Sequence, residues 1–116
     1  MAHQPMISDL SIEPVLENIE LPMDELVAFC QSHPIRKLCL FGSVLRPDFS
    51  PKSDVDVLVE FTLGAGIGFI ELFAVQEELT DLLGRQVDLL TAGALSRHFR
   101  QQVLDQAKIL YEEHAL

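Results

Sequence analysis

Residues 40–59 read LFGSVLRPDFSPKSDVDVLV, and this stretch decides the fold. The apolar residues 35–41, which lead into it, are typical of a buried strand that ends at a Gly-Ser pair. Residues 54–61 combine β-branched side chains with a period of two, which predicts a second strand. The two prolines between the strands indicate an irregular connection, and a short helix could follow Ser43 at its start.

The second strand carries two acidic residues in its first half. Asp54 and Asp56 are two positions apart, so both side chains leave one face of the strand, whereas Val55, Val57 and Val59 point into the core. Two carboxylates 4 Å apart repel each other by roughly 4 kcal/mol at an effective dielectric of about 20, so they need a compensating partner. Grouped oxygen ligands of this kind favour Mg²⁺ that is shared with substrate phosphates.

A third acid and the Gly-Ser pair complete the candidate site. Asp88 lies in another short apolar segment, and all three carboxylates converge if that strand runs beside the first acidic strand. Three acids can hold two metal ions about 3.5–4 Å apart, which suits in-line attack on the α-phosphorus of a nucleotide with pyrophosphate leaving. Gly42 allows close approach of the backbone to a ligand, and Ser43 supplies a hydroxyl and an N–H for phosphate.

A simpler explanation is that these aspartates are solvated charges at strand edges. That explanation would be favoured for a lone Asp-x-Asp, because short motifs have many false matches. Here a strand, a Gly-Ser pair, two acids in a Val-rich strand and a third strand acid occur together, and Asp is uncommon in strands. Arg97 and Arg100 could also contact phosphate or a partner, but a solvated helix face is the preferred interpretation.

The remaining elements follow from apolar periodicity and from helix-ending residues. Helices are expected over residues 22–32, 69–83 and 95–110, with a third strand over 85–90 and a flexible glycine loop over 64–68. Their predicted buried stripes are Leu26, Phe29 and Cys30; Ile70, Phe73 and Leu79; and Leu95, Phe99, Val103 and Ala107. Residues 1–21 are expected to form a loose arm with a short strand or turn near 12–15. Helices that alternate with strands predict an α/β layer with three or more strands.

The length and charge of the chain limit what it can do. A chain of 116 residues fits one domain. Its formal charge of −10, with 18 acidic and 8 basic residues, argues against direct nucleic-acid binding and suits a basic protein partner, a cationic small molecule or a divalent metal.

Cys30 and Cys39 lie in apolar surroundings and are expected to be reduced. No membrane span or signal peptide is evident, so the cytoplasm is the expected compartment.

Three segments together resemble the minimal nucleotidyltransferases of the DNA polymerase beta-like superfamily. These segments are Leu40 to Arg46, Ser53 to Val59 and Val87 to Leu90, and the resemblance covers about residues 23–113, with 109–112 as the last strand or helix end. It implies an α/β (α+β) nucleotidyltransferase fold, with a small mixed sheet flanked by helices, over residues 22–116. It further implies that Gly42, Ser43 and Arg46 bind ATP, that Asp54 and Asp56 are Mg²⁺ ligands, and that Asp88 is the third ligand or the general base.

The resemblance includes the MntA-type antitoxins, which are paired with HEPN toxins. In those members the activity is AMP transfer from ATP onto a tyrosine of the HEPN ribonuclease, which silences it. The implied function is therefore protein adenylylation by an antitoxin with two Mg²⁺ ions, as a homo-oligomer or as a hetero-oligomer with its toxin. Two alternatives remain open: a nucleotidyltransferase for a small cationic molecule such as an aminoglycoside, and a non-catalytic module that masks a toxin by contact alone.

Overall fold

The computed structural model describes residues 19–47, 49–50 and 52–113. The helices and strands in this part of the chain are α2 (Met23–Ser32), β1 (Ile35–Phe41), β2 (Val55–Phe61), α3 (Phe69–Leu83), β3 (Val87–Thr91), α4 (Arg97–Gln106) and β4 (Lys108–Glu112). Two short 3-10 helices, η1 (Gly42–Leu45) and η2 (Ala92–Ala94), follow β1 and β3. The short element expected near residues 12–15 lies outside the described residues.

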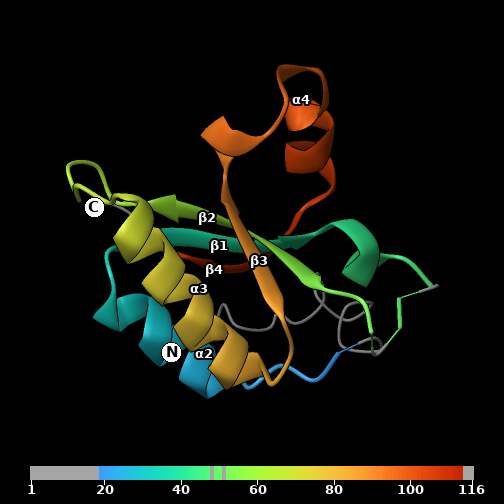
Figure 1. The fold of residues 1–116 in the computed structure, drawn as a ribbon, viewed down its shortest axis with the longest axis horizontal. Helices are drawn as coiled ribbons and strands as arrows, with labels where there is room; N and C mark the ends of the chain where they lie inside the picture. Colours follow the sequence, from blue (N-terminus) through green and yellow to red (C-terminus); the bar gives the residue numbers. More distant parts are fainter. Residues whose placement is uncertain (1–18, 48, 51, 114–116) are drawn as a thin grey trace, which may run out of the picture.

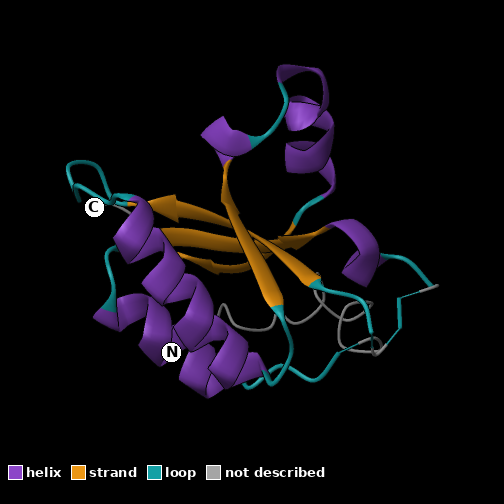
Figure 2. Cartoon of the chain, viewed as in Figure 1, coloured by secondary structure: helices purple, strands orange, loops and turns teal. Residues whose placement is uncertain are grey.

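The four strands form one mixed sheet in the order β3-β2-β1-β4 (Figures 1 and 2). Strands β2 and β3 are parallel, while β1 is antiparallel to both β2 and β4. Helices α2 and α3 lie side by side against one face of the sheet, whereas α4 packs on the other face (Figure 1). The predicted α/β fold with a small mixed sheet flanked by helices is therefore confirmed.

The main core lies between the sheet and the pair α2 and α3. It contains the valines of β2 together with the predicted stripe of α2, that is Val55, Val57, Val59, Leu26, Phe29 and Cys30. A smaller apolar cluster on the opposite face consists of Cys39, Phe41 and Leu58, and the residues packed on it are Leu90 of β3, Val103 of α4, and Leu95 and Ala107 beside that helix. Both cysteines are free and buried, as expected from their apolar surroundings. Because the core takes every second residue of β2, Asp56 is left on the face that α4 only partly covers.

The buried stripe of α3 differs from the sequence prediction. Leu79 is buried as expected, but Ile70 is 83% exposed and Phe73 is 60% exposed, while Val75 and Leu83 are buried in their place. At about 100° per residue, Val75, Leu79 and Leu83 fall on one side of the helix and Ile70 on nearly the opposite side. The first turns of α3 carry apolar residues on several faces, so periodicity alone selected the wrong stripe.

The C-terminal part of the chain also differs from the prediction. The last helix ends at Gln106 rather than near residue 110, and Lys108–Glu112 forms the edge strand β4, which pairs with β1. The backbone leaves the helical region at Ala107, whose φ and ψ are −62° and 143°. Phe99, predicted to be buried, is 60% exposed, whereas Leu95, Val103 and Ala107 do pack on the smaller cluster. The segment 109–112 is thus a last strand.

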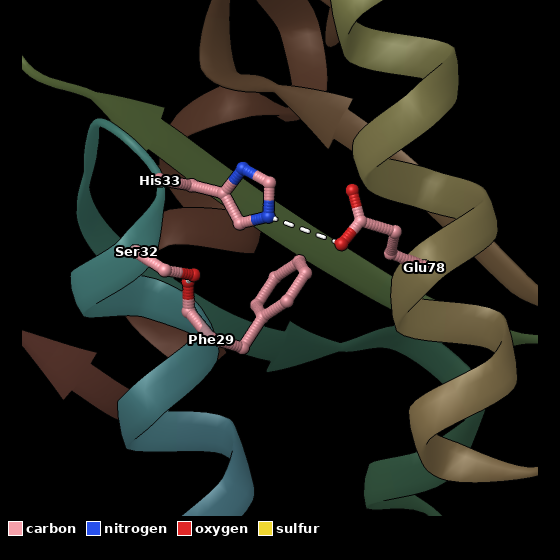
Figure 3. Close-up of polar contacts among 4 residues, drawn as sticks. All are labelled: Phe29, Ser32, His33 and Glu78. Carbon is pink, nitrogen blue, oxygen red and sulfur yellow. Dashed lines mark hydrogen bonds and ion pairs between the residues drawn. The ribbon is translucent and has the colours of Figure 1, made fainter.

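Helix α3 is fixed to its neighbours by polar side chains as well as by the core. Thr80 Oγ1 accepts a hydrogen bond from the backbone N–H of Val87 (3.1 Å), and Gln76 Oε1 accepts one from Leu89 (3.0 Å). These two N–H groups lie on the outer edge of the edge strand β3, so α3 satisfies donors that the sheet leaves unpaired. On the α2 side, the His33 ring lies against Phe29 and reaches Glu78 of α3 at 3.3 Å (Figure 3).

Among residues 19–47, 49–50 and 52–113, no helix has both the length and the apolar character of a membrane span.

Candidate active site

Asp56 and Asp88 lie side by side on adjacent parallel strands. The register between β2 and β3 pairs Val55 with Val87 and Asp56 with Asp88, so both acidic side chains leave the same face of the sheet. On its other side Asp56 pairs with Phe41, the last residue of β1. The two carboxylates therefore stand next to the point where β1 ends and the Gly-Ser turn begins.

Gly42 lies directly against the Asp56 carboxylate. Its φ is +75°, in the left-handed region that favours glycine, and a Cβ at this position would stand 2.3 Å from Asp56 Oδ2. Any side chain would occupy the space of that oxygen. The backbone conformation favours glycine here, and a larger residue would have to displace the Asp56 carboxylate.

Ser43 connects the turn to both acids that surround the start of β2. Its backbone N–H donates a hydrogen bond to the Asp56 carboxylate, and its Oγ donates to the backbone carbonyl of Asp54 at 3.5 Å. The turn is closed by a hydrogen bond of 2.9 Å from the N–H of Arg46 to the Ser43 carbonyl. The short helix η1 thus begins with backbone groups that face the acidic cluster.

The pKa of Asp56 is shifted by burial and by the charges around it. Burial raises the pKa of Asp56, and the neighbouring carboxylates of Asp88 and Asp54 raise it further. The Ser43 N–H and the positive charge of Arg46 lower this pKa, but the net direction is upward. Carboxylates held together with this mutual repulsion suit a bound divalent cation.

Asp54 has a different position from the one expected. It directly precedes β2, which begins at Val55, and its side chain is exposed. Asp88 and Arg46 are also exposed, whereas Asp56 is half-buried, so the site opens to solvent. In the described part of the chain, no three His, Cys, Asp or Glu side chains form an arrangement that could by itself hold a metal ion. The donors fit an ion held by one or two carboxylates and completed by substrate phosphates, as is usual for Mg²⁺.

One side chain that was not predicted from the sequence contacts the loop before Asp54. The Arg85 guanidinium donates from Nη2 to the backbone carbonyls of Ser50 and Ser53, at 2.7 and 3.0 Å. Only its position in the turn between α3 and β3, three residues before Asp88, could have drawn attention to it. Arg100, interpreted as part of a solvated helix face, is instead half-buried and donates to the Leu95 carbonyl at 3.2 Å.

The family of the chain follows from a comparison with known families. The family model for the polymerase beta nucleotidyltransferase domain matches residues 24–115, and the chain belongs to this family. The chain is therefore an enzyme of the nucleotidyltransferase class, as the resemblance indicated.

Relatives by sequence carry more specific names. The chain is 30% identical over 90 residues to a predicted protein adenylyltransferase of Methanocaldococcus jannaschii, which covers 78% of this chain and 95% of that protein. It is 38% identical over 71 residues to the protein adenylyltransferase MntA of Thermococcus cleftensis, covering 60% of this chain and 69% of that protein.

Solved structures confirm the fold. A predicted minimal nucleotidyltransferase superimposes with a TM-score of 0.62 at 30% identity, over 73% of this chain and 85% of that one. A crystal structure of a toxin–antitoxin with AMP-PNP superimposes with a TM-score of 0.65, over 81% of this chain and 76% of that one. The identity to the second is 23%, so this likeness concerns the fold.

Proposed function

We propose that this chain transfers AMP from ATP to a tyrosine hydroxyl of a partner HEPN toxin and thereby acts as its antitoxin. The observation that carries the proposal is the pairing of Asp56 with Asp88 next to the Gly42–Ser43 turn, because it joins a metal-binding pair of acids to a phosphate-binding corner. The kinship to the Thermococcus cleftensis protein adenylyltransferase supports a protein acceptor.

The nucleotide is expected to bind at the turn between β1 and η1. Arg46 supplies positive charge beside this turn, and backbone N–H groups in a turn of this kind can bind phosphate. Asp54, Asp56 and Asp88 would hold two Mg²⁺ ions, whose positive charge would neutralise the phosphates and the pyrophosphate leaving group. Gly42 has no side chain that would displace the Asp56 carboxylate from this turn.

The transfer itself is one displacement at the α-phosphorus. The acceptor oxygen forms a bond to this phosphorus while the bond from the phosphorus to the bridging oxygen of pyrophosphate breaks. The proton of the acceptor hydroxyl passes to a base, and Asp88 is suited to this role because it is more exposed than its neighbour Asp56. Asp56 is the more enclosed ligand, oriented by the Ser43 N–H.

The charge of the chain is compatible with a protein partner that approaches this face. The formal charge of −10 favours association with a basic surface, such as that of a ribonuclease. The acidic side chains at the site are open to solvent, so a tyrosine of a folded protein can reach them. We infer a hetero-oligomer with the toxin as the working state and cytoplasmic residence for both.

The test is a transfer reaction with α-labelled ATP, Mg²⁺ and a HEPN protein encoded beside this chain. Label should enter a tyrosine of the HEPN protein, and Asp54→Ala combined with Asp56→Ala should remove the label while the variant remains folded by circular dichroism. Failure of the wild type to label any protein acceptor would overturn the proposal. Label that enters only an aminoglycoside would assign the small-molecule alternative, and full neutralisation of the toxin by the double variant would assign the masking alternative.

A further inference from the structure

Arg85 holds the loop that leads into the acidic strand. Its guanidinium Nη2 donates to two carbonyls of the 49–53 turn, those of Ser50 and Ser53, and its Cζ lies 4.5 Å from the centre of the Phe49 ring. The side chain is half-buried, so these hydrogen bonds are protected from competition by water. Arg85 thus contacts three described residues of this segment, namely Phe49, Ser50 and Ser53.

The turn that Arg85 holds is also closed by its own serines. The N–H of Ser53 donates to the Ser50 carbonyl (3.0 Å), and the N–H of Ser50 donates to Ser53 Oγ (3.2 Å). The Ser50 carbonyl therefore accepts from both the guanidinium and the Ser53 N–H, whereas the Ser53 carbonyl accepts from the guanidinium and the Ser53 hydroxyl accepts from the Ser50 N–H. Because Ser53 is joined directly to Asp54, the position of this turn sets where the Asp54 backbone begins.

The segment that carries Arg85 also carries Asp88. The N–H of Val55 donates to the carbonyl of Gln86 at 2.9 Å, which starts the pairing that brings Asp56 beside Asp88. Arg85 therefore fixes the loop before β2 relative to the same strand that supplies the third acid. Asp54 is exposed and precedes β2, whereas Asp56 and Asp88 lie within strands. Of the three acids, Asp54 is therefore held least firmly by the sheet.

We propose that Arg85 is a positioning residue for the transfer reaction: it holds the 49–53 turn so that the Asp54 carboxylate stands at a fixed place beside Asp56 and Asp88. This inference rests on the proposed function, because it assigns Asp54 to the metal. A lysine would keep the charge but would lose the planar group that stacks on Phe49 while its N–H groups reach two carbonyls. The Arg85→Lys variant should therefore be impaired, and Arg85→Gln more so.

The experiment measures turn order and metal binding separately. Hydrogen exchange followed by NMR reports the Ser53 and Val55 amides, and titration of Mn²⁺ into protein with an ATP analogue methylene-bridged between the α- and β-phosphorus reports metal affinity. In Arg85→Gln both amides should exchange faster, the Leu89 amide should not, and Mn²⁺ affinity should fall by about tenfold to a hundredfold. Arg36→Gln, which removes a guanidinium paired with Glu60 on the sheet, is the matched control and should change neither quantity.

The outcomes separate the two proposals. Failure of the wild type to bind Mn²⁺ with the analogue would defeat the proposed function, and the exchange rates alone would then decide whether Arg85 orders the turn. If the wild type binds and Arg85→Gln binds as tightly, or loses affinity without faster exchange at Ser53, the positioning role is overturned. Should Arg85→Gln not fold, Arg85→Lys takes its place, and wild-type affinity in that variant would equally overturn the role.

Discussion

At the scale of single residues, Gly42 and Asp56 constrain each other. The turn can lie against the acid only because position 42 has no side chain, and Asp56 in turn accepts the Ser43 N–H that orients the turn. Substitution of Gly42 should therefore act through the geometry of the turn, whereas substitution of Asp56 should act through the charge at the site.

Gly42→Ala should separate function from stability. The positive φ costs roughly 1–2 kcal/mol for alanine, and the new Cβ should displace the flexible end of Asp56 rather than the backbone. Gly64→Ala is the matched control, since Gly64 has a φ of +77° but nothing within 4 Å of its Cβ position. In urea unfolding both variants should lose similar stability, whereas only Gly42→Ala should lose binding of Mn²⁺ with the ATP analogue. Equal binding by the two variants would contradict the geometry.

Asp56→Asn should stabilise the metal-free protein at neutral pH. Burial and the neighbouring carboxylate of Asp88 raise the pKa of Asp56 above its ordinary value of 3.8, so folding is less favourable when this carboxyl is ionised than when it is protonated. The associated stability is present below pH 3.8 and is lost as the pH rises through the folded pKa. Asparagine keeps the acceptor for the Ser43 N–H and removes the repulsion, which should add about 0.5–2 kcal/mol at pH 7.

The measurement is the difference in Tm between Asp56→Asn and wild type across the pH range. This difference should shrink as the pH falls toward 4, because the wild-type carboxyl then takes up its proton. Mg²⁺ and ATP should reverse the order at pH 7, since only the wild type gains from ligand binding. A variant that is less stable than wild type at pH 7 without metal would refute the repulsion argument.

The residue scale also shows how far sequence reasoning reaches. The period of two in residues 54–61 places Asp56 opposite the valines correctly, and the pairing with Asp88 follows once β3 is parallel to β2. The role of Arg85 could not be predicted, because it depends on contacts across more than thirty positions of the chain, between Ser50 and Arg85. The acidic residues can thus be predicted from local sequence pattern, whereas the side chain that holds the loop before them is visible only in the tertiary structure.

At the scale of elements, α3 has a double role. It buries Val75, Leu79 and Leu83 against the sheet, and it satisfies the outer N–H groups of the edge strand β3 through Gln76 and Thr80. Asp88 lies between the two strand residues so held, which couples the register of this strand to the helix.

Gln76→Leu should destabilise the protein although the change adds apolar surface. It leaves the N–H of the buried Leu89 without an acceptor, at a cost of about 1–3 kcal/mol. Gln101→Leu is the control, because Gln101 is exposed on α4 and bonds only Asp105. That change should stay within about 0.5 kcal/mol in urea unfolding. Equal stability of the two variants would show that the hydrogen bond from Leu89 to Gln76 does not contribute to stability.

The elements that sequence reasoning placed wrongly have physical explanations. Residues 101–110 contain good helix formers, so nothing local distinguishes the end of α4 from β4; the strand exists because the free edge of β1 accepts it. The N-terminal half of α3 contains Phe69, Ile70, Leu72 and Phe73, so more than one apolar stripe can be drawn through it. In contrast α2 has one clear stripe, and its prediction is confirmed.

At the scale of the whole molecule, one end of the sheet carries acidic side chains and the other leads to exposed apolar ones. The start of β2 carries the acids, whereas its far end leads into exposed apolar residues on the loop 62–68 and the first turns of α3. These residues are Leu63, Phe69, Ile70 and Phe73, which are between 60% and 100% exposed. Apolar groups gathered in this way add nothing to the core of the isolated chain.

Ile70→Gln should therefore leave the stability of the isolated chain within about 0.5 kcal/mol of wild type. Leu79→Ala, on the same helix but fully buried, should cost about 2–5 kcal/mol. Thermal and urea unfolding of both variants check the comparison. A loss of several kcal/mol in Ile70→Gln would restore the stripe that was predicted from the sequence.

The pairing of Asp56 with Asp88 has one more consequence. Because successive side chains of a strand alternate between faces, a shift of β3 by one residue would send Asp88 into the apolar layer and bring Val87 or Leu89 beside Asp56. Lengthening or shortening the 84–86 connection by one residue would thus threaten the apolar core as well as catalysis, because Val87 and Leu89 are both buried. The length of the connection between α3 and β3 therefore determines which side chains face the active site. It should tolerate change only where each residue of β3 keeps its side of the sheet.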